Sequence, residues 1–242
     1  MSFFSTITWW FSEAPHFEGT VIATERIGSR IQKVTIALPT PIEAPFPIGC
    51  FVQTMTWGCI PRNYSVATAT TTSFTILVSF GGMGAGARFF SQSPVGTKIK
   101  CYGAFDDFPY RYGTKRSKVF FATSTGVAPF RRMIEETIKE DVEAVLILGT
   151  PKESDIAFRA EFEELSRGNN KFTFVPTLSS SEPEWTGARG FVADQVGDSH
   201  KKEFLRKSDI YICGVPMMTL GVIDLLHKIG VPESQIFVQK FG

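Results

Sequence analysis

The stretch KVFFATSTGVAPFRRMIEETIKE, residues 118–140, indicates how the second half of the chain folds. Residues 118–124 are rich in aromatic and β-branched side chains, which is typical of a buried strand. Gly126 allows a turn, and Pro129 suits the first turn of the amphipathic segment 128–140. The stretch therefore predicts a strand, a turn and a helix in succession.

The same alternation continues along the rest of the chain. We predict further strands at 143–150, 171–178, 209–214 and 235–241, and further helices at 155–167 and 219–230. Strands that alternate with helices of about a dozen residues are typical of βαβ units in a parallel sheet. The second half is therefore expected to be an α/β domain.

The first half has a different texture. Short segments rich in β-branched and aromatic residues predict strands at 21–27, 33–38, 51–57, 63–69, 74–80 and 97–102. This close spacing is typical of a small antiparallel β-barrel. The polar segment 107–117, which Pro109 and Gly113 interrupt, predicts the boundary. We divide the chain into an N-terminal extension (1–16), a barrel domain (17–112) and an α/β domain (113–242).

The charge balance argues against a nucleic-acid partner, because 25 Lys and Arg residues stand against 24 Asp and Glu residues, for a net charge of +1. The four cysteines form no CxxC pair, so we expect neither a metal site nor an iron–sulfur cluster. Scattered cysteines without a signal-peptide pattern predict a cytoplasmic protein.

Residues 1–11, MSFFSTITWWF, are aromatic but too few to cross a bilayer. Two interpretations stay open for this segment. It packs on the body of the protein, as aromatic anchors usually do, or it docks on a membrane surface or a partner, since Trp favours interfaces.

Three predicted strand ends carry small or polar residues. In an open parallel sheet, ligands bind at the carboxyl ends of the strands. Residues 122–129 provide hydroxyls and free backbone N–H groups there, which suits a phosphate or a ribose. An ordinary βα turn explains the same pattern, because the G-x-G-x-x-G fingerprint is missing. Residues 179–181 and 213–218 form the other two strand ends, and each is weak evidence alone.

In the barrel half, Arg62 and Tyr64 are two residues apart in a predicted strand, so their side chains share a face. Together with Ser65 they provide a cation, an aromatic ring and a hydroxyl, which would suit a phosphorylated aromatic cofactor. The Gly-dense segment 81–88 either brings backbone N–H groups to a diphosphate or forms a flexible hairpin loop.

Taken in order, these segments resemble the ferredoxin–NADP reductase-like flavoprotein family over about residues 17–242. Any one match is weak, but five matches in the same order make a strong signal. The matches are R-x-Y-S at 62–65, the glycine-rich pyrophosphate loop at 84–90, T-G-x-A-P-F at 125–130, C-G-P-x-x-M at 213–218 and E-x-F-G at 239–242.

The resemblance implies a flavin-binding barrel and a nucleotide-binding α/β sheet, with FAD and NADH or NADPH as cofactors. It implies hydride transfer to the flavin, with Ser65 near flavin N5 and Cys213 near the nicotinamide as catalytic residues. The cofactor-binding residues that it implies are Arg62, Asn63, Tyr64, Ser65, Val66, Ala67, Gly82, Gly84, Ala85, Gly86, Ala87, Thr125, Gly126, Ala128, Pro129, Ser179, Ser180, Cys213, Gly214, Met217 and Phe241.

The chain departs from the family pattern at several positions. Ala87 replaces a Ser or Thr, so a hydroxyl donor is lost, and Gln239 replaces a Glu, so a carboxylate is lost. Thr123 and Ser124 replace two glycines, and Val215 stands where C-G-P has its proline.

We expect NADH rather than NADPH to be the electron donor. NADPH adds a 2′-phosphate, and the segment 179–181 has no Arg to bind it. The hydroxyls of Ser179 and Ser180 suit a neutral ribose, and Glu182 would repel a phosphate that came close. Lys152 is the cation that could oppose this preference.

Three functions fit these observations. The first is a reductase that passes electrons to a separate acceptor, such as ferredoxin, flavodoxin, an oxygenase component or a small molecule. The second is a reductase of free flavin or ferric chelates, which shares the fold. The third is a catalytically weak electron-transfer or assembly subunit, which Ala87 and Gln239 favour.

Overall fold

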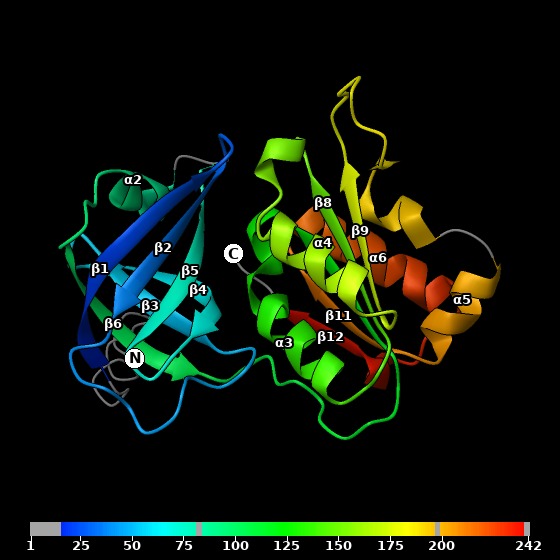
Figure 1. Cartoon of the computed structure of the whole chain (residues 1–242), viewed down its shortest axis with the longest axis horizontal. Coiled ribbons are helices and arrows are strands. Elements are labelled where there is room, and N and C mark those ends of the chain that lie inside the picture. The colour runs from blue at the N-terminus through cyan, green and yellow to red at the C-terminus, as the bar shows by residue number, and fades with distance from the viewer. Residues whose placement is uncertain (1–15, 81–83, 197–198, 240–242) are drawn as a thin grey trace, which may run out of the picture.

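Six antiparallel strands close into a barrel in the first half of the chain, as the sequence predicts (Figure 1). The structure is a computed structural model, and it describes residues 16–80, 84–196 and 199–239. The strands follow the order β1-β2-β5-β4-β3-β6 around the barrel. Their bounds are β1 His16–Ile27, β2 Ile31–Ala37, β3 Phe51–Thr56, β4 Ile60–Ala69, β5 Ser73–Ser79 and β6 Lys98–Phe105, with helix α2 at Ala85–Ser91 between β5 and β6.

The barrel interior follows the period of two that strands impose. Val34 and Ile36 of β2 point inward and are completely buried, together with Ile76 of β5. Phe90 of α2 joins this core. Burial of these aliphatic and aromatic side chains stabilises the barrel by about 1.5–3 kcal/mol for each large residue.

The second half is a six-stranded parallel sheet in the order β10-β9-β8-β7-β11-β12. The strands are β7 Lys118–Thr123, β8 Ala144–Thr150, β9 Phe172–Leu178, β10 Ala188–Arg189, β11 Asp209–Cys213 and β12 Ile236–Gln239. The helices are α3 Ala128–Lys139, α4 Arg159–Gly168, α5 Ser199–Arg206 and α6 Pro216–Lys228, with short 3-10 turns η1 Ser124–Val127, η2 Glu153–Asp155, η3 Val192–Val196 and η4 Glu233–Gln235.

Helices cover both faces of this sheet, with α3 and α4 on one face and α5 and α6 on the other (Figure 1). Alternate residues of the central strand β7 serve the two layers. Phe120 packs toward Phe130 of α3, whereas Phe121 packs in the cluster that contains Val222 of α6. Both faces of β7 are therefore buried, which explains its nearly continuous run of apolar residues.

The order of the strands reverses between β7 and β11. Chain order runs from β7 through β8 to β9 on one side, and from β11 to β12 on the other. Loops that leave such neighbouring strands in opposite directions open a crevice at their carboxyl ends. The end of β7 and the end of β11 are therefore the expected place for a ligand.

A continuous apolar cluster joins the barrel to the α/β sheet. Ala67 of β4 and Leu77 of β5 lie in the same buried cluster as Phe130 and Met133 of α3. Arg132 also donates to the carbonyl of Phe46, at 2.6 Å. The connecting residues 106–117 follow β6 and precede β7, and we propose the division between residues 112 and 113 within them.

The elements differ from the prediction in three places. The helix expected at 155–167 begins at Arg159, because Phe158 adopts a left-handed conformation with φ of 58°. The short strand β10 and helix α5 were not predicted. Residues 1–11, for which packing on the protein body and docking on a surface are both open, lie outside the described residues. None of the helices in the described part of the chain is long and apolar enough to span a membrane.

Candidate functional site

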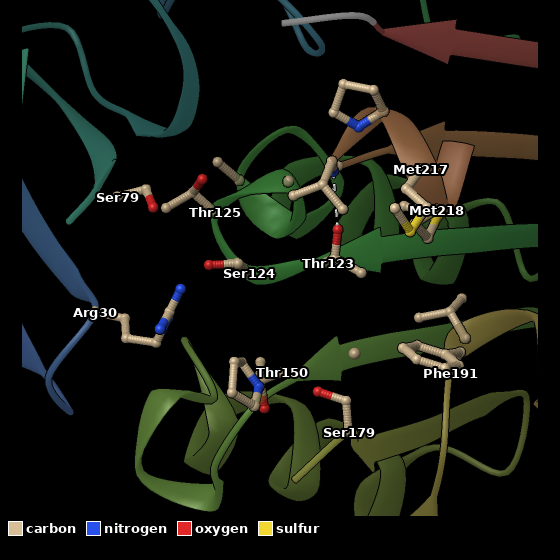
Figure 2. Close-up of a pocket in the computed structure, with 18 of the residues that line it drawn as sticks. Arg30, Ser79, Thr123, Ser124, Thr125, Thr150, Ser179, Phe191, Met217 and Met218 are labelled. Carbon is tan, nitrogen blue, oxygen red and sulfur yellow. Dashed lines mark hydrogen bonds between the residues drawn. The ribbon is translucent and has the colours of Figure 1, made fainter. Parts of the chain in front are cut away.

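A cleft of about 830 Å³ separates the carboxyl ends of β7, β8, β9 and β11 from the barrel wall (Figure 2). The barrel contributes residues of β4 and β5 and the turn between β1 and β2. The cleft lies at the reversal of strand order and is of the size that small ligands and cofactors occupy.

Two loops on the sheet side fit closely because they carry glycine. A Cβ atom at Gly126 would lie 2.2 Å from the carbonyl oxygen of Cys213, and one at Gly214 would lie 2.2 Å from Thr123 Oγ1. Real side chains cannot approach so closely, so any larger residue would push the loops apart. The two glycines therefore allow the loops after β7 and β11 to pack closely at the floor of the cleft.

Two departures from the family pattern compensate for each other at this floor. The hydroxyl of Thr123 accepts a hydrogen bond from the backbone N–H of Val215, at 3.0 Å (Figure 2). A proline at position 215 would have no N–H to donate. Thr123 in place of glycine and Val215 in place of proline thus form one link between the loops.

On the barrel side, β4 presents Asn63, Tyr64 and Ser65 to the cleft. The ring of Tyr64 packs edge-on against Phe90, with 5.5 Å between the ring centroids. Burial raises the pKa of the Tyr64 phenol, so it stays protonated. A Cβ atom at Gly86 would lie 2.1 Å from Tyr64 Oη and 3.4 Å from Arg62 Cγ, which places these two side chains on one face as predicted.

A polar cluster, in which Ser65, Cys213 and Gln239 are buried, lies where the barrel meets the last strand of the sheet. Ser65 Oγ donates to Gln239 Oε1 at 2.7 Å, and Cys213 Sγ donates to the same oxygen at 3.9 Å. Gln239 Nε2 donates to Asp107 Oδ1 at 3.2 Å. Burial, helped by the charge of Asp107, raises the pKa of the Cys213 thiol to about 12, so the thiol is a neutral donor.

Arg30 is a charged residue of the cleft that the sequence did not indicate. Its side chain lies at the mouth of the cleft and points toward the loops that carry Ser124 and Thr150 (Figure 2). Among the described residues that line the cleft, the charged ones are Arg30 and Asp194. Asp194 already accepts from the backbone N–H of Phe191 at 2.7 Å, so Arg30 is the cation available to an anionic ligand. A single Arg after a turn carries no motif that could have revealed this position.

The cleft brings together some of the predicted residues and leaves others apart. The predicted residues that line it are Asn63, Tyr64, Ser65, Thr125, Gly126, Ala128, Ser179, Gly214 and Met217. Those placed behind or beside it are Arg62, Val66, Ala67, Gly84, Ala85, Gly86, Ala87, Pro129, Ser180 and Cys213. Gly82 and Phe241 lie outside the described residues.

Three of the residues outside the cleft, Val66, Ala67 and Cys213, are buried in the apolar cores or in the polar cluster around Gln239. Val66 is buried inside the barrel, and Ala67 belongs to the apolar cluster between barrel and sheet, because successive residues of β4 face opposite sides. Cys213 is completely buried, and it shares the acceptor Gln239 Oε1 with Ser65, which lines the cleft.

Several known proteins are similar to this chain in sequence or in fold. The profile of the oxidoreductase NAD-binding domain matches residues 120–223. Ferredoxin–NADP reductase B of Sorangium cellulosum is 27% identical over 95% of this chain and 99% of its own length. These similarities support a ferredoxin–NADP reductase-like flavoprotein.

Two further relatives differ in how much of them the chain covers. A subunit of the Na⁺-translocating NADH-quinone reductase of Marinomonas sp. is 32% identical over 63% of this chain, and the match covers 39% of the length of that relative. A ferredoxin NADP⁺ reductase structure from Neisseria gonorrhoeae with bound FAD and NADP has a TM-score of 0.79 at 19% identity, over 94% of this chain and 99% of that one. This structure shows the common fold.

With the NAD-binding domain and these named reductases as relatives, the protein is an NAD(P)H-dependent oxidoreductase, with FAD and NAD(P)H as cofactors. The residues present fit a flavin. Because residue 86 is glycine, no Cβ atom there collides with the side chains of Tyr64 and Arg62. Within the described residues, Arg62 donates to the carbonyl of Pro61 at 2.6 Å, and the rest of its five N–H donors are free for an anion.

Proposed function

We propose that this protein takes hydride from NADH onto bound FAD and passes the electrons to a separate acceptor. The observation that supports this proposal best is the shared cleft. It places Asn63, Tyr64 and Ser65 of the barrel opposite Thr125 and Gly126 of the sheet. Two ligands held on opposite walls of one cleft can react directly, because their orientation is set before the reaction.

The barrel wall would hold FAD. Tyr64 is fixed against Phe90 and would pack on the flavin ring, while the Ser65 hydroxyl would face its polar edge. Arg62 would bind the pyrophosphate through its planar guanidinium group, which matches phosphate oxygens in pairs. Bound FAD would supply the chemistry, since it accepts hydride and returns electrons one or two at a time.

The sheet wall would hold the dinucleotide. Thr125 and Gly126 follow β7, where backbone N–H groups and a hydroxyl would meet a ligand. Arg30 reaches the same space from the barrel and would bind a phosphate of the dinucleotide. The two walls therefore both contribute to dinucleotide binding.

We favour NADH because of the residues around the ends of β8 and β9. Ser179 lines the cleft, and its hydroxyl suits a neutral ribose. The Glu182 carboxylate accepts from the backbone N–H of Glu153 at 2.8 Å, which holds a negative charge beside Lys152. A 2′-phosphate near these residues would meet repulsion, and Lys152 would already be near an anion.

The proposed acceptor is a ferredoxin, a flavodoxin or an oxygenase component. Two relatives in the comparisons support an acceptor of this kind: the reductase from Sorangium cellulosum is named for ferredoxin, and a structural neighbour with a TM-score of 0.82 is the ferredoxin reductase in carbazole 1,9a-dioxygenase. The acceptor must be a separate molecule, since the chain has no Cys run for a cluster.

The absorbance spectrum of the purified protein tests the proposal. We expect a flavin spectrum that survives gel filtration and bleaches when NADH is added without oxygen, followed by transfer to an added plant-type ferredoxin or flavodoxin. Flavin that washes away but is reduced in solution would favour the free-flavin reductase. Retained flavin that neither dinucleotide bleaches would favour the assembly subunit.

A further inference from the structure

The Ser65 hydroxyl of the barrel is held in one direction by Gln239, in the last strand of the sheet. Ser65 Oγ lines the cleft, yet its hydrogen atom is directed away from the cleft, because it donates to Gln239 Oε1 at 2.7 Å. Both atoms are in buried side chains, so water does not compete for this bond. Toward a ligand in the cleft, Ser65 Oγ can therefore only accept a hydrogen bond through its lone pairs.

Asp107 determines which end of the Gln239 amide faces Ser65. A side-chain amide has a donor end and an acceptor end of nearly equal shape, and its neighbours decide the orientation. A carboxylate only accepts hydrogen bonds, so Asp107 Oδ1 must face the NH₂ group, at 3.2 Å from Nε2. The Oε1 atom is thereby turned to Ser65 and Cys213, and both of them donate to it.

We propose that Asp107, acting through Gln239, sets Ser65 as a hydrogen-bond acceptor toward the flavin, and that this pair of positioning residues raises the flavin reduction potential. The inference rests on the proposed function, which places the flavin against Ser65. Oxidised flavin N5 is an acceptor, whereas reduced flavin carries a hydrogen atom on N5. A Ser65 that can only accept therefore bonds the reduced form and leaves the oxidised form without a partner.

The charge of Asp107 alone predicts the opposite effect on the potential. A negative charge near the flavin disfavours added electrons, so removing it should raise the potential. Loss of the hydrogen-bond direction should lower the potential, because a freed Ser65 hydroxyl can then donate to oxidised N5 as well. The sign of the change distinguishes the two effects.

Asp107→Ala and Gln239→Leu test the inference by equilibrium reduction against reference dyes, followed by absorbance. Gln239→Leu should strengthen binding of oxidised relative to reduced flavin by about threefold to tenfold, as one neutral hydrogen bond does. That ratio corresponds to a fall of about 15–30 mV for a two-electron couple. Asp107→Ala should also lower the potential, relative to Asp106→Ala, which removes an exposed carboxylate next to it in the chain.

The Ser65→Ala background separates the pathway from general damage. In that background Gln239→Leu should leave the potential unchanged, because the two residues act through one hydroxyl. Asp107 is exposed, so Asp107→Ala remains informative even where the buried Gln239→Leu fails to fold.

Three results would overturn the inference. If the flavin reduction potential rises equally in Asp107→Ala and Asp106→Ala, Asp107 acts through its charge alone. If the potential is unchanged in folded Gln239→Leu, Gln239 does not position Ser65. In both cases the parent still binds flavin, and the proposed function stands. A parent protein that binds no flavin would instead overturn the proposed function and the inference together.

Discussion

The backbone N–H of Ser29 donates to Asp155 Oδ1 at 3.1 Å, across 126 residues of sequence. The turn between β1 and β2 of the barrel thereby rests on η2 of the α/β sheet. Gly28 lets the two come together, because a Cβ atom there would lie 2.2 Å from Asp155 Oδ1. Arg30 directly follows Ser29 in the chain and lies at the mouth of the cleft.

Gly28→Ala should destabilise the protein more than Gly58→Ala. Both glycines have positive φ, 54° and 77°, so each alanine suffers similar backbone strain. Nothing lies within 4 Å of a Cβ atom at Gly58, whereas at Gly28 it would displace Asp155. We expect an extra loss of at least about 1 kcal/mol in the free energy of unfolding, measured with urea. Equal losses in the two variants would show that the turn does not rest on Asp155.

Arg30→Ala should weaken NADH binding by about tenfold to a hundredfold, because a charge-assisted bond contributes about 1.5–3 kcal/mol. Calorimetric titration of NAD⁺ or NADH measures the effect. Lys98→Ala is the matched control, since it removes a cation from the same barrel at a position that does not line the cleft. An Arg30→Ala variant with the dissociation constant of the parent would remove Arg30 from the site.

Arg62→Ala should weaken FAD retention by about tenfold to a hundredfold, since one charge-assisted bond to the pyrophosphate is lost. Arg62→Lys should recover part of the affinity, because it restores the charge but not the paired donors. Flavin content after gel filtration and the dissociation constant of FAD are the measurements. As a control, Arg167→Ala changes an exposed arginine of α4 that donates to Glu163. The assignment fails where folded Arg62→Ala keeps the FAD of the parent.

The buried thiols should make the folded state less stable at high pH. Burial raises the pKa of Cys101 to about 12, while an unfolded thiol ionises near pH ~8.5. The raised pKa means that the folded state keeps the proton which the unfolded state loses. Below about pH 8.5 the Cys101 thiol therefore does not make stability depend on pH. As the pH rises from there toward 12, the free energy of unfolding falls by up to about 1.4 kcal/mol per pH unit.

Cys101→Ala should reduce that slope, measured as the free energy of unfolding between about pH 9 and pH 10.5. Cys59→Ala is the control, because Cys59 is exposed. Alkylation of the native protein should modify Cys59 before the three buried cysteines, Cys50, Cys101 and Cys213. Identical slopes for Cys101→Ala and the parent would contradict the prediction.

Much of the fold could be predicted because its signals are local. In the barrel strands, apolar residues recur with a period of two, and in the helix of residues 118–140 they recur with a period of about 3.6, so both patterns can be identified from the sequence. Helix α5 gave no such signal, because Phe204 and Leu205 are its apolar residues among charged neighbours. The late start of α4 depends on the left-handed Phe158, which its sequence neighbours do not reveal.

The candidate site divides in the same way. Arg62, Tyr64, Ser65 and Gly126 could be identified because each belongs to a motif of adjacent residues. Cys213, which is expected near the nicotinamide, does not line the cleft, and its thiol donates to Gln239 Oε1. Its role in the reaction stays a prediction, now through that contact.

The sequence by itself determined the two-domain pattern, the family motifs and the glycines that turns require, since these depend on residues a few positions apart. Only the tertiary structure decided the positions of Arg30 and Asp107. Arg30 faces the cleft because a turn of the barrel rests on the other domain, and Asp107 reaches Gln239 across 132 residues. Such contacts depend on how two separately folded sheets pack against each other, and no local period of hydrophobicity carries that information.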